Sequence, residues 1–290
     1  MKYLIKMEIK KAIKNRFFLI AVLIGGAITV LSLIYNYQIY HEHQLMLRYV
    51  RGNSEVVQNP LYPMFTVFNN WIGGEPFSLG SSLYFFVFPL LVALPYGWSY
   101  CEEKTSGYHR YVVAKTGKTK YFLSKYLAVF ISGGLAMVIP LIFNFITAML
   151  IFPAITPIVV YDTAYGVFGG SLMSKLYYTI PFIYLLVYLI IDFVFCGLIA
   201  CLAFVGSVFI KYKAVVVILP QMLLLLFHYV RQYVYVSGGT QYKEISPLFF
   251  LRPVQSAYRA SWVIILVEML ILFVVTFGIC VLGEKRNEIY

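Results

Sequence analysis

The chain has 290 residues, of which 61% are hydrophobic and 12% are charged, and its mean hydropathy is +0.80. Soluble domains carry about 25% charged residues, so this composition excludes a water-soluble globular protein. The net charge of +11 does not indicate nucleic-acid binding, because the basic residues flank apolar stretches and form no separate domain.

The N-terminal segment, residues 2–15, has a lysine at every fourth position and isoleucines on another helical face. This pattern predicts an amphipathic helix that lies in the headgroup layer, with its lysines toward anionic membrane lipids. The alternative is a basic flank that only orients the first span. The lysines are Lys2, Lys6, Lys10 and Lys14.

Six apolar stretches predict an all-α polytopic membrane protein with one membrane domain over residues 1–290. A helix needs about 20 residues to cross a hydrocarbon core. The predicted spans are about 17–36, 82–98, 126–152, 179–210, 214–230 and 261–283. The fourth is so long that it must tilt, protrude, or break near Gly197 or Gly206.

Lysine and arginine predict the orientation of these spans. With the N-terminus inside, the inner segments hold 16 Lys and Arg and the outer segments hold 7. Cytoplasmic segments are the richer in these cations, so we expect both termini in the cytoplasm. The inner segments are 1–16, 99–125, 211–213 and 284–290, and the outer ones are 37–81, 153–178 and 231–260.

The outer segments contain no strong metal or disulfide pattern. The 37–81 loop is large and holds His41 and His43, a weak metal signal without other clear ligands. All four cysteines lie in spans or at the inner boundary. The apolar run 248–251 is too short to span, so it predicts an element that dips partway into the membrane or lies flat.

The inner loop 99–125 carries the most informative pattern. An acidic pair, Glu102 and Glu103, is followed by Ser106-Gly107 and then by Arg110. A short amphipathic element over 111–120 leads to Lys125, just before the third span. Lys115 and Lys118 make this part of the loop basic.

This loop resembles that of ABC-2-type transporter permeases, and the resemblance extends to the whole layout. It implies that the loop is a coupling helix that docks on a separate ATPase subunit. It also implies two ATPases and a second permease copy or paralogue, with ATP and Mg on the ATPases. Residues expected to couple are Glu102, Glu103, Gly107, Arg110, Lys115 and Lys118.

No nucleotide site or other cofactor is predicted on this chain itself. Gly117-Lys118-Thr119 resembles the end of a phosphate loop, but the motif needs glycine at 112, where this chain has valine. The alternative reading of the loop is a solvated basic segment that only sets topology.

Two carboxylates, Asp192 and Glu268, lie inside predicted spans. An ionisable group at that depth is costly and is a functional candidate by default. Three roles stay open: hydrogen bonding between helices, lining a translocation path, and proton coupling. We expect protonation, or hydrogen bonds to groups such as Asn144, Gln221 or tyrosine hydroxyls.

Together these features predict the permease subunit of a prokaryotic ABC exporter in the cell membrane. The resemblance implies a peptide (including antimicrobial peptides), a drug or a lipid-like amphipathic molecule as cargo. One alternative is an intramembrane enzyme of the CAAX-protease type, whose EExxxR motif needs arginine at 107, where this chain has glycine. Another is a secondary transporter, which usually shows an internal repeat.

Overall fold

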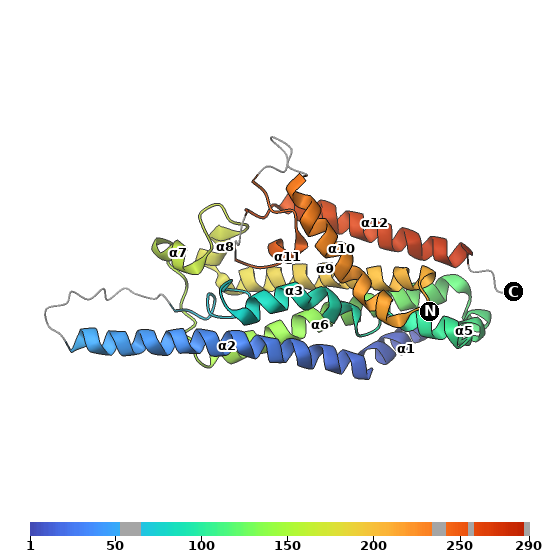
Figure 1. Ribbon diagram of the computed structural model, residues 1–290, viewed down its shortest axis with the longest axis horizontal. Coiled ribbons are helices and arrows are strands. Elements are labelled where there is room, and N and C mark those ends of the chain that lie inside the picture. Colours follow the sequence, from blue (N-terminus) through green and yellow to red (C-terminus); the bar gives the residue numbers. More distant parts are fainter. Residues whose placement is uncertain (53–64, 234–241, 255–257, 287–290) are drawn as a thin grey trace.

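The computed structural model describes residues 1–52, 65–233, 242–254 and 258–286. Within these ranges the chain is helical, and the only strand-like pairing is a single bridge between Lys243 and Arg259. Figure 1 shows an elongated bundle whose long helices run roughly along the long axis.

Five helices are long and apolar enough to cross a membrane. They are α2 (Arg16–Arg51), α6 (Lys118–Met149), α9 (Pro181–Phe209), α10 (Lys213–Val230) and α12 (Trp262–Arg286). The chain is therefore a membrane protein, in agreement with its composition. A sixth apolar helix, α3 (Leu79–Ala93), is shorter.

Short helices occupy the two ends of the bundle. At one end are α1 (Lys2–Ile13), α4 (Ser99–Thr105) and α5 (Tyr108–Thr116). The remaining short elements are η1 (Val159–Tyr161), α7 (Asp162–Tyr165), α8 (Ser174–Thr179), η2 (Arg231–Tyr233) and α11 (Pro247–Phe250). Figure 1 places α7 and α8 at the end opposite α1 and α5.

Helix α9 is the centre of the bundle. The apolar part of α9 is 72% buried, whereas that of α12 is 17% buried and that of α10 is 22% buried. Helix α6 packs along α9, and α3, α10 and α12 also contact it. The exposed faces of α2, α10 and α12 carry large aliphatic and aromatic side chains, which suits contact with lipid.

Helix α9 runs unbroken from Pro181 to Phe209, so it does not break at either glycine considered from the sequence. Both glycines are contact points with neighbouring helices. A Cβ atom at Gly197 would lie 2.7 Å from the Phe130 carbonyl oxygen, and one at Gly206 would lie 2.4 Å from the Leu219 side chain. Small residues let membrane helices approach closely, so these glycines favour packing rather than a kink.

Two helices extend beyond the apolar stretches from which the spans were predicted. Helix α2 continues to Arg51 instead of ending near 36, because residues 37–50 contain no glycine or proline and many good helix formers. The predicted 37–81 loop therefore starts as helix. Helix α6 starts at Lys118 rather than 126, directly after Gly117.

The second predicted span, 82–98, is not one helix. Helix α3 ends at Ala93, and a turn follows before α4 begins at Ser99. Pro95 lies in that turn and has no backbone N–H to donate to a helical hydrogen bond.

Candidate functional site: a buried ion cluster behind the 99–117 loop

The loop 99–117 contains two short helices separated by a sharp turn. Gly107, between α4 and α5, has φ +74°, and Gly117, after α5, has φ +86°. Only glycine adopts such angles at little cost. No atom lies within 4 Å of a Cβ built at either position, so backbone conformation and not crowding requires glycine here. The amphipathic element predicted over 111–120 is in fact α5, at 108–116.

One face of helix α5 packs against the bundle, and the other face is exposed. Val112 and Val113 are buried against the bundle. Arg110, Tyr111 and Lys115 are exposed. The outer face of α5 is thus a short cationic and aromatic surface that is free to meet another molecule.

A buried ion cluster lies behind this loop. The Lys125 ammonium on α6 lies 3.0 Å from a carboxylate oxygen of Glu8 on α1 and 2.9 Å from one of Glu103 on α4. The side chains of Lys125 and Glu8 are 0% and 1% exposed, and that of Glu103 is 14% exposed. One cation thus joins α4 and α6 to α1, which is far from both in the sequence.

Two tyrosines complete the cluster. The Tyr96 hydroxyl donates to Glu8 at 2.8 Å, and the Tyr121 hydroxyl donates to Glu103 at 2.5 Å. The Lys125 ammonium also lies 4.9 Å and 5.5 Å from the centres of these two rings. Hydrogen bonds and ring faces therefore replace the water that the charges lose on burial.

The charges of the cluster balance. Lys11, half-exposed on α1, lies 3.0 Å from the second Glu8 oxygen, so two carboxylates face two ammonium groups. Burial alone would raise the pKa of Glu8, but Lys125, Lys11 and the Tyr96 hydrogen bond outweigh it, and the pKa falls below 4.5. The Glu8 carboxylate is therefore ionised at neutral pH.

The loop is also tied to the α9–α10 hairpin. Glu102 on α4 pairs with Lys213 at 3.1 Å, and both side chains are about half exposed. The Lys104 ammonium donates to the Val208 carbonyl at 3.1 Å. Helix α4 thus contacts α1 and α6 through the cluster and the α9–α10 turn through Lys213. Helix α5 packs on α4 and α6, and α4 also packs on α9.

The coupling residues predicted from sequence do not gather at one point. Glu103 enters the buried cluster, Glu102 pairs with Lys213, and Gly107 forms the turn. Arg110 and Lys115 are exposed and Lys118 is half-buried, and none joins the cluster. These three positions belong to the surface of the loop rather than to its anchor.

Glu8 was not predicted from the sequence as a site residue. It is the only acidic residue in the basic N-terminal segment, one helical turn from Leu4 and from Ala12, which are also buried. That single acid on an apolar face was a usable signal of a buried partner. The predicted helix itself is confirmed, and its Lys2, Lys6, Lys10 and Lys14 are exposed.

The four polar residues singled out in the predicted spans do not form one site. They are Asn144, Asp192, Gln221 and Glu268. Asn144 accepts from the Ile72 N–H at 2.8 Å and donates to the Thr29 carbonyl at 2.8 Å. Gln221 donates to the Phe86 carbonyl at 3.0 Å. Both amides therefore join backbones and neither binds a carboxylate.

Asp192 is fully buried, and neither of its oxygens has a hydrogen-bond partner among the described residues. One oxygen of Glu268 is likewise unpartnered there. An unpaired carboxylate in an apolar interior is costly, so the burial of Asp192 favours its neutral form.

Comparison with known proteins gives no relative: no family model, no curated protein and no solved structure matches this chain.

Proposed function

We propose that this chain is the membrane subunit of an ATP-driven transporter of the ABC-2 type in a prokaryotic cell membrane. The observation that supports this most is the inner loop, whose short helix α5 exposes Arg110, Tyr111 and Lys115. The same loop is anchored to α1 and α6 by the buried ions. A surface free to dock and a rigid anchor behind it are the two parts that a coupling element needs.

ATP and Mg belong to the partner in this proposal. Two ATPase subunits dock on the α5 surfaces of two membrane subunits, which are two copies of this chain or one copy and a paralogue. The cations on α5 suit an acidic groove on the ATPase. Closure of the ATPases then moves α5 and α4, and the ion cluster passes that movement to α1 and α6. The cargo is a peptide, a drug or a lipid-like amphipathic molecule, and the direction is export.

Six spans are part of the proposal, with α3 as the second. Fifteen residues of α3 reach about 22 Å at 1.5 Å per residue, less than a core of about 30 Å. The turn before α4 and the residues before Leu79 supply the remainder. The 231–260 segment, which includes the buried helix α11, is the proposed re-entrant element of the outer side.

Reporter tags test this topology. We expect tags at positions 1, 115 and 290 to be cytoplasmic, and tags at 60 and 240 to be external. A cytoplasmic tag at 240 would overturn the six-span arrangement.

Cysteine cross-linking tests the docking surface. All four native cysteines are buried, so a cysteine introduced on α5 is the accessible thiol. The proposal expects an ABC ATPase in a neighbouring reading frame. That ATPase is expressed with the Tyr111→Cys variant, and the pair is probed with a short thiol-to-amine cross-linker. We expect a cross-linked product for Tyr111→Cys and none for the control Lys175→Cys, which is exposed on α8 at the other end of the bundle. Equal products, or none from α5, would contradict the proposal.

The protease alternative has less support. Glu103, one of the two acids that match the motif, is bound to Lys125 and Tyr121. A ring nitrogen of His109 lies 3.2 Å from the backbone carbonyl oxygen of Glu103. This histidine contact does not involve the Glu103 carboxylate.

A further inference from the structure

At the end of the bundle opposite α1 and α5, two cations stand side by side. A parallel bridge pairs Lys243 with Arg259, and the Glu244 N–H donates to the Arg259 carbonyl at 2.9 Å. Residues paired across such a bridge project their side chains to the same side. Like charges placed opposite each other are destabilising. An anion bound between the two side chains would offset this repulsion.

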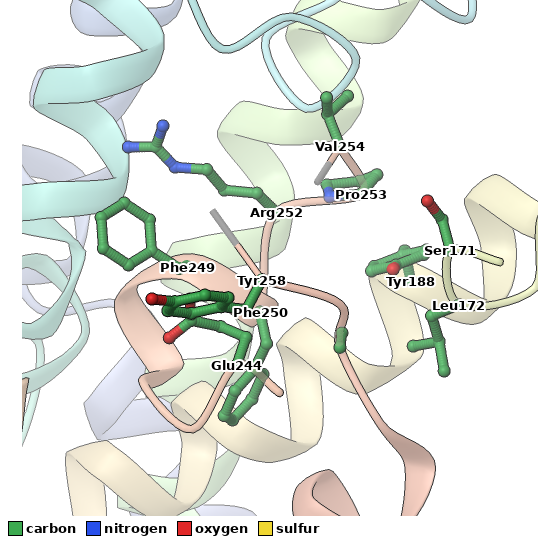
Figure 2. A pocket seen from close by; sticks show the side chains of 11 residues that line it. Ser171, Leu172, Tyr188, Glu244, Phe249, Phe250, Arg252, Pro253, Val254 and Tyr258 are labelled. Carbon is green, nitrogen blue, oxygen red and sulfur yellow. The ribbon is translucent and has the colours of Figure 1, made fainter. Parts of the chain in front are cut away.

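The chain does not supply that anion among its described residues. Neither Lys243 nor Arg259 forms an ion pair there. Glu244 is next in sequence, but successive residues of extended chain face opposite sides. Glu244 lines an adjoining cavity with Tyr188 and Phe250 (Figure 2). One of its carboxylate oxygens is paired with Arg231. In Figure 2 Arg252, which also lines this cavity, extends toward α3, where its guanidinium lies over the Phe85 ring at 5.0 Å.

Lys243 and Arg259 line an open groove of about 600 Å³. Its other walls include Tyr242, Met173 and Trp262, and no acidic residue is among its lining residues in the described chain. Trp262 is the first residue of α12, the last apolar helix. Tryptophan and tyrosine at the end of a membrane helix mark the headgroup level, so this groove opens where lipid headgroups lie.

Gly170 shapes the groove around Arg259. A Cβ atom at Gly170 would lie 2.6 Å from an Arg259 guanidinium nitrogen, so any larger residue there would displace this group. The guanidinium therefore lies close against the backbone at Gly170, in the wall of the groove.

We propose that this groove binds the phosphate headgroup of an anionic phospholipid. Lys243 and Arg259 hold the phosphate oxygens, the guanidinium with its paired N–H donors and the ammonium as a point charge. Tyr242 and Trp262 lie beside the glycerol region, and the exposed apolar face of α12 receives the acyl chains. The lipid neutralises a charge pair that the chain leaves unbalanced. This site is independent of the transport function proposed above.

Binding of defined lipids to the purified full-length chain tests the proposal. Native mass spectrometry is used to titrate phosphatidylglycerol, phosphatidylcholine with the same acyl chains, and glycerol phosphate. We expect phosphatidylglycerol to bind most tightly. A cation near an anionic headgroup contributes about a fivefold change in affinity. The double variant Lys243→Gln/Arg259→Gln should therefore weaken that binding roughly thirtyfold.

Two further variants make the result specific. Lys175→Gln removes an exposed cation at the same end without touching the groove, and it should bind as the wild type does. Gly170→Val keeps every charge but displaces the Arg259 guanidinium, and it should weaken binding severalfold. Unchanged affinity in a well-folded double variant, or equal binding of phosphatidylcholine, would overturn the proposal. Glycerol phosphate binding as tightly as the lipid would show a soluble anion as the ligand and would overturn the lipid assignment.

Discussion

The Lys125 ammonium on α6 lies 3.0 Å from the Glu8 carboxylate on α1, with both side chains buried, although the two residues are 117 positions apart. This pair makes α1 a fixed part of the bundle. A helix that only floated among lipid headgroups would turn its charges to water, whereas α1 turns Glu8 inward. Movement of α1 relative to α6 must therefore break a buried ion pair or carry both helices together.

Removal of Lys125 is expected to destabilise the chain strongly. Lys125→Met leaves Glu8 and Glu103 buried without their shared cation, which costs about 3–5 kcal/mol and lowers the apparent melting temperature by roughly 10 °C. Thermal unfolding in detergent, followed by loss of the monodisperse peak, measures the change. The control Lys120→Met alters an exposed lysine of the same helix and should change little. Equal melting temperatures for the two variants would show that the cluster adds no stability.

A double variant separates the pair from its surroundings. If Glu8 and Lys125 interact directly, Glu8→Gln/Lys125→Met should be more stable than the sum of the two single changes predicts. Additive losses would contradict a direct ion pair.

The cluster should lose stability in acid. The pKa of Glu8 lies below 4.5 in the folded chain, so its contribution is complete above the ordinary value of 4.5. The contribution is lost as the pH falls below 4.5 through the lowered pKa. The apparent melting temperature between pH 7 and pH 3.5 should fall less steeply for Glu8→Gln than for the wild type. Parallel curves would exclude Glu8 as a source of the acid sensitivity.

Charge reversal on α5 should separate docking from folding. Arg110 and Lys115 are exposed and have no role in the buried cluster, so Arg110→Glu/Lys115→Glu should keep the melting temperature within about 1 °C of wild type, because surface changes alter stability by only about 0.5 kcal/mol. If α5 docks on an acidic groove, the same variant should bind the partner ATPase at least tenfold more weakly, as measured by pull-down titration. Reversal of Lys175 on α8 is the matched control. If the α5 variant binds the ATPase normally, the loop is not the docking surface and serves only to set the topology of the chain.

Asn144 should matter more to stability than Gln221. Asn144→Leu leaves the buried Ile72 N–H without its acceptor, a loss of about 1–3 kcal/mol. Gln221 only donates to a carbonyl of α3, Phe86, and its own oxygen is already unpartnered, so Gln221→Leu should be nearly neutral. Melting temperatures of the two variants check the order, and a larger loss for Gln221→Leu would contradict it.

Asp192 offers a test for a role in transport. Its oxygens bind nothing among the described residues, so Asp192→Asn should leave stability and transport almost unchanged, because the amide matches a neutral carboxyl in size. Asp192→Leu should even raise the melting temperature, since it removes an unpaired buried polar group. Loss of transport in well-folded Asp192→Asn protein would show that the carboxyl exchanges a proton or contacts the cargo.

The sequence by itself determined the membrane class and the approximate place of each long helix. Apolar runs of about 20 residues have few alternatives in lipid, because every backbone group must be hydrogen-bonded within the segment. The amphipathic helix α1 and the turn at Gly107 also followed from local pattern. Boundaries were less certain from sequence, because polar residues continue a helix as readily as apolar ones do, and α2 and α6 both extend well into polar sequence.

Only the tertiary structure decided which charges meet. Glu102 and Glu103 are adjacent and chemically identical, yet one is half-exposed beside Lys213 and the other is bound to the buried Lys125. The side chains of successive helical residues point about 100° apart, so the bundle packed around α4 sets their different partners. The pairing of Glu8 with Lys125, and of Lys243 with Arg259, likewise depends on segments brought together by packing. No local propensity encodes such contacts, because their energy exists only after the bundle has excluded water.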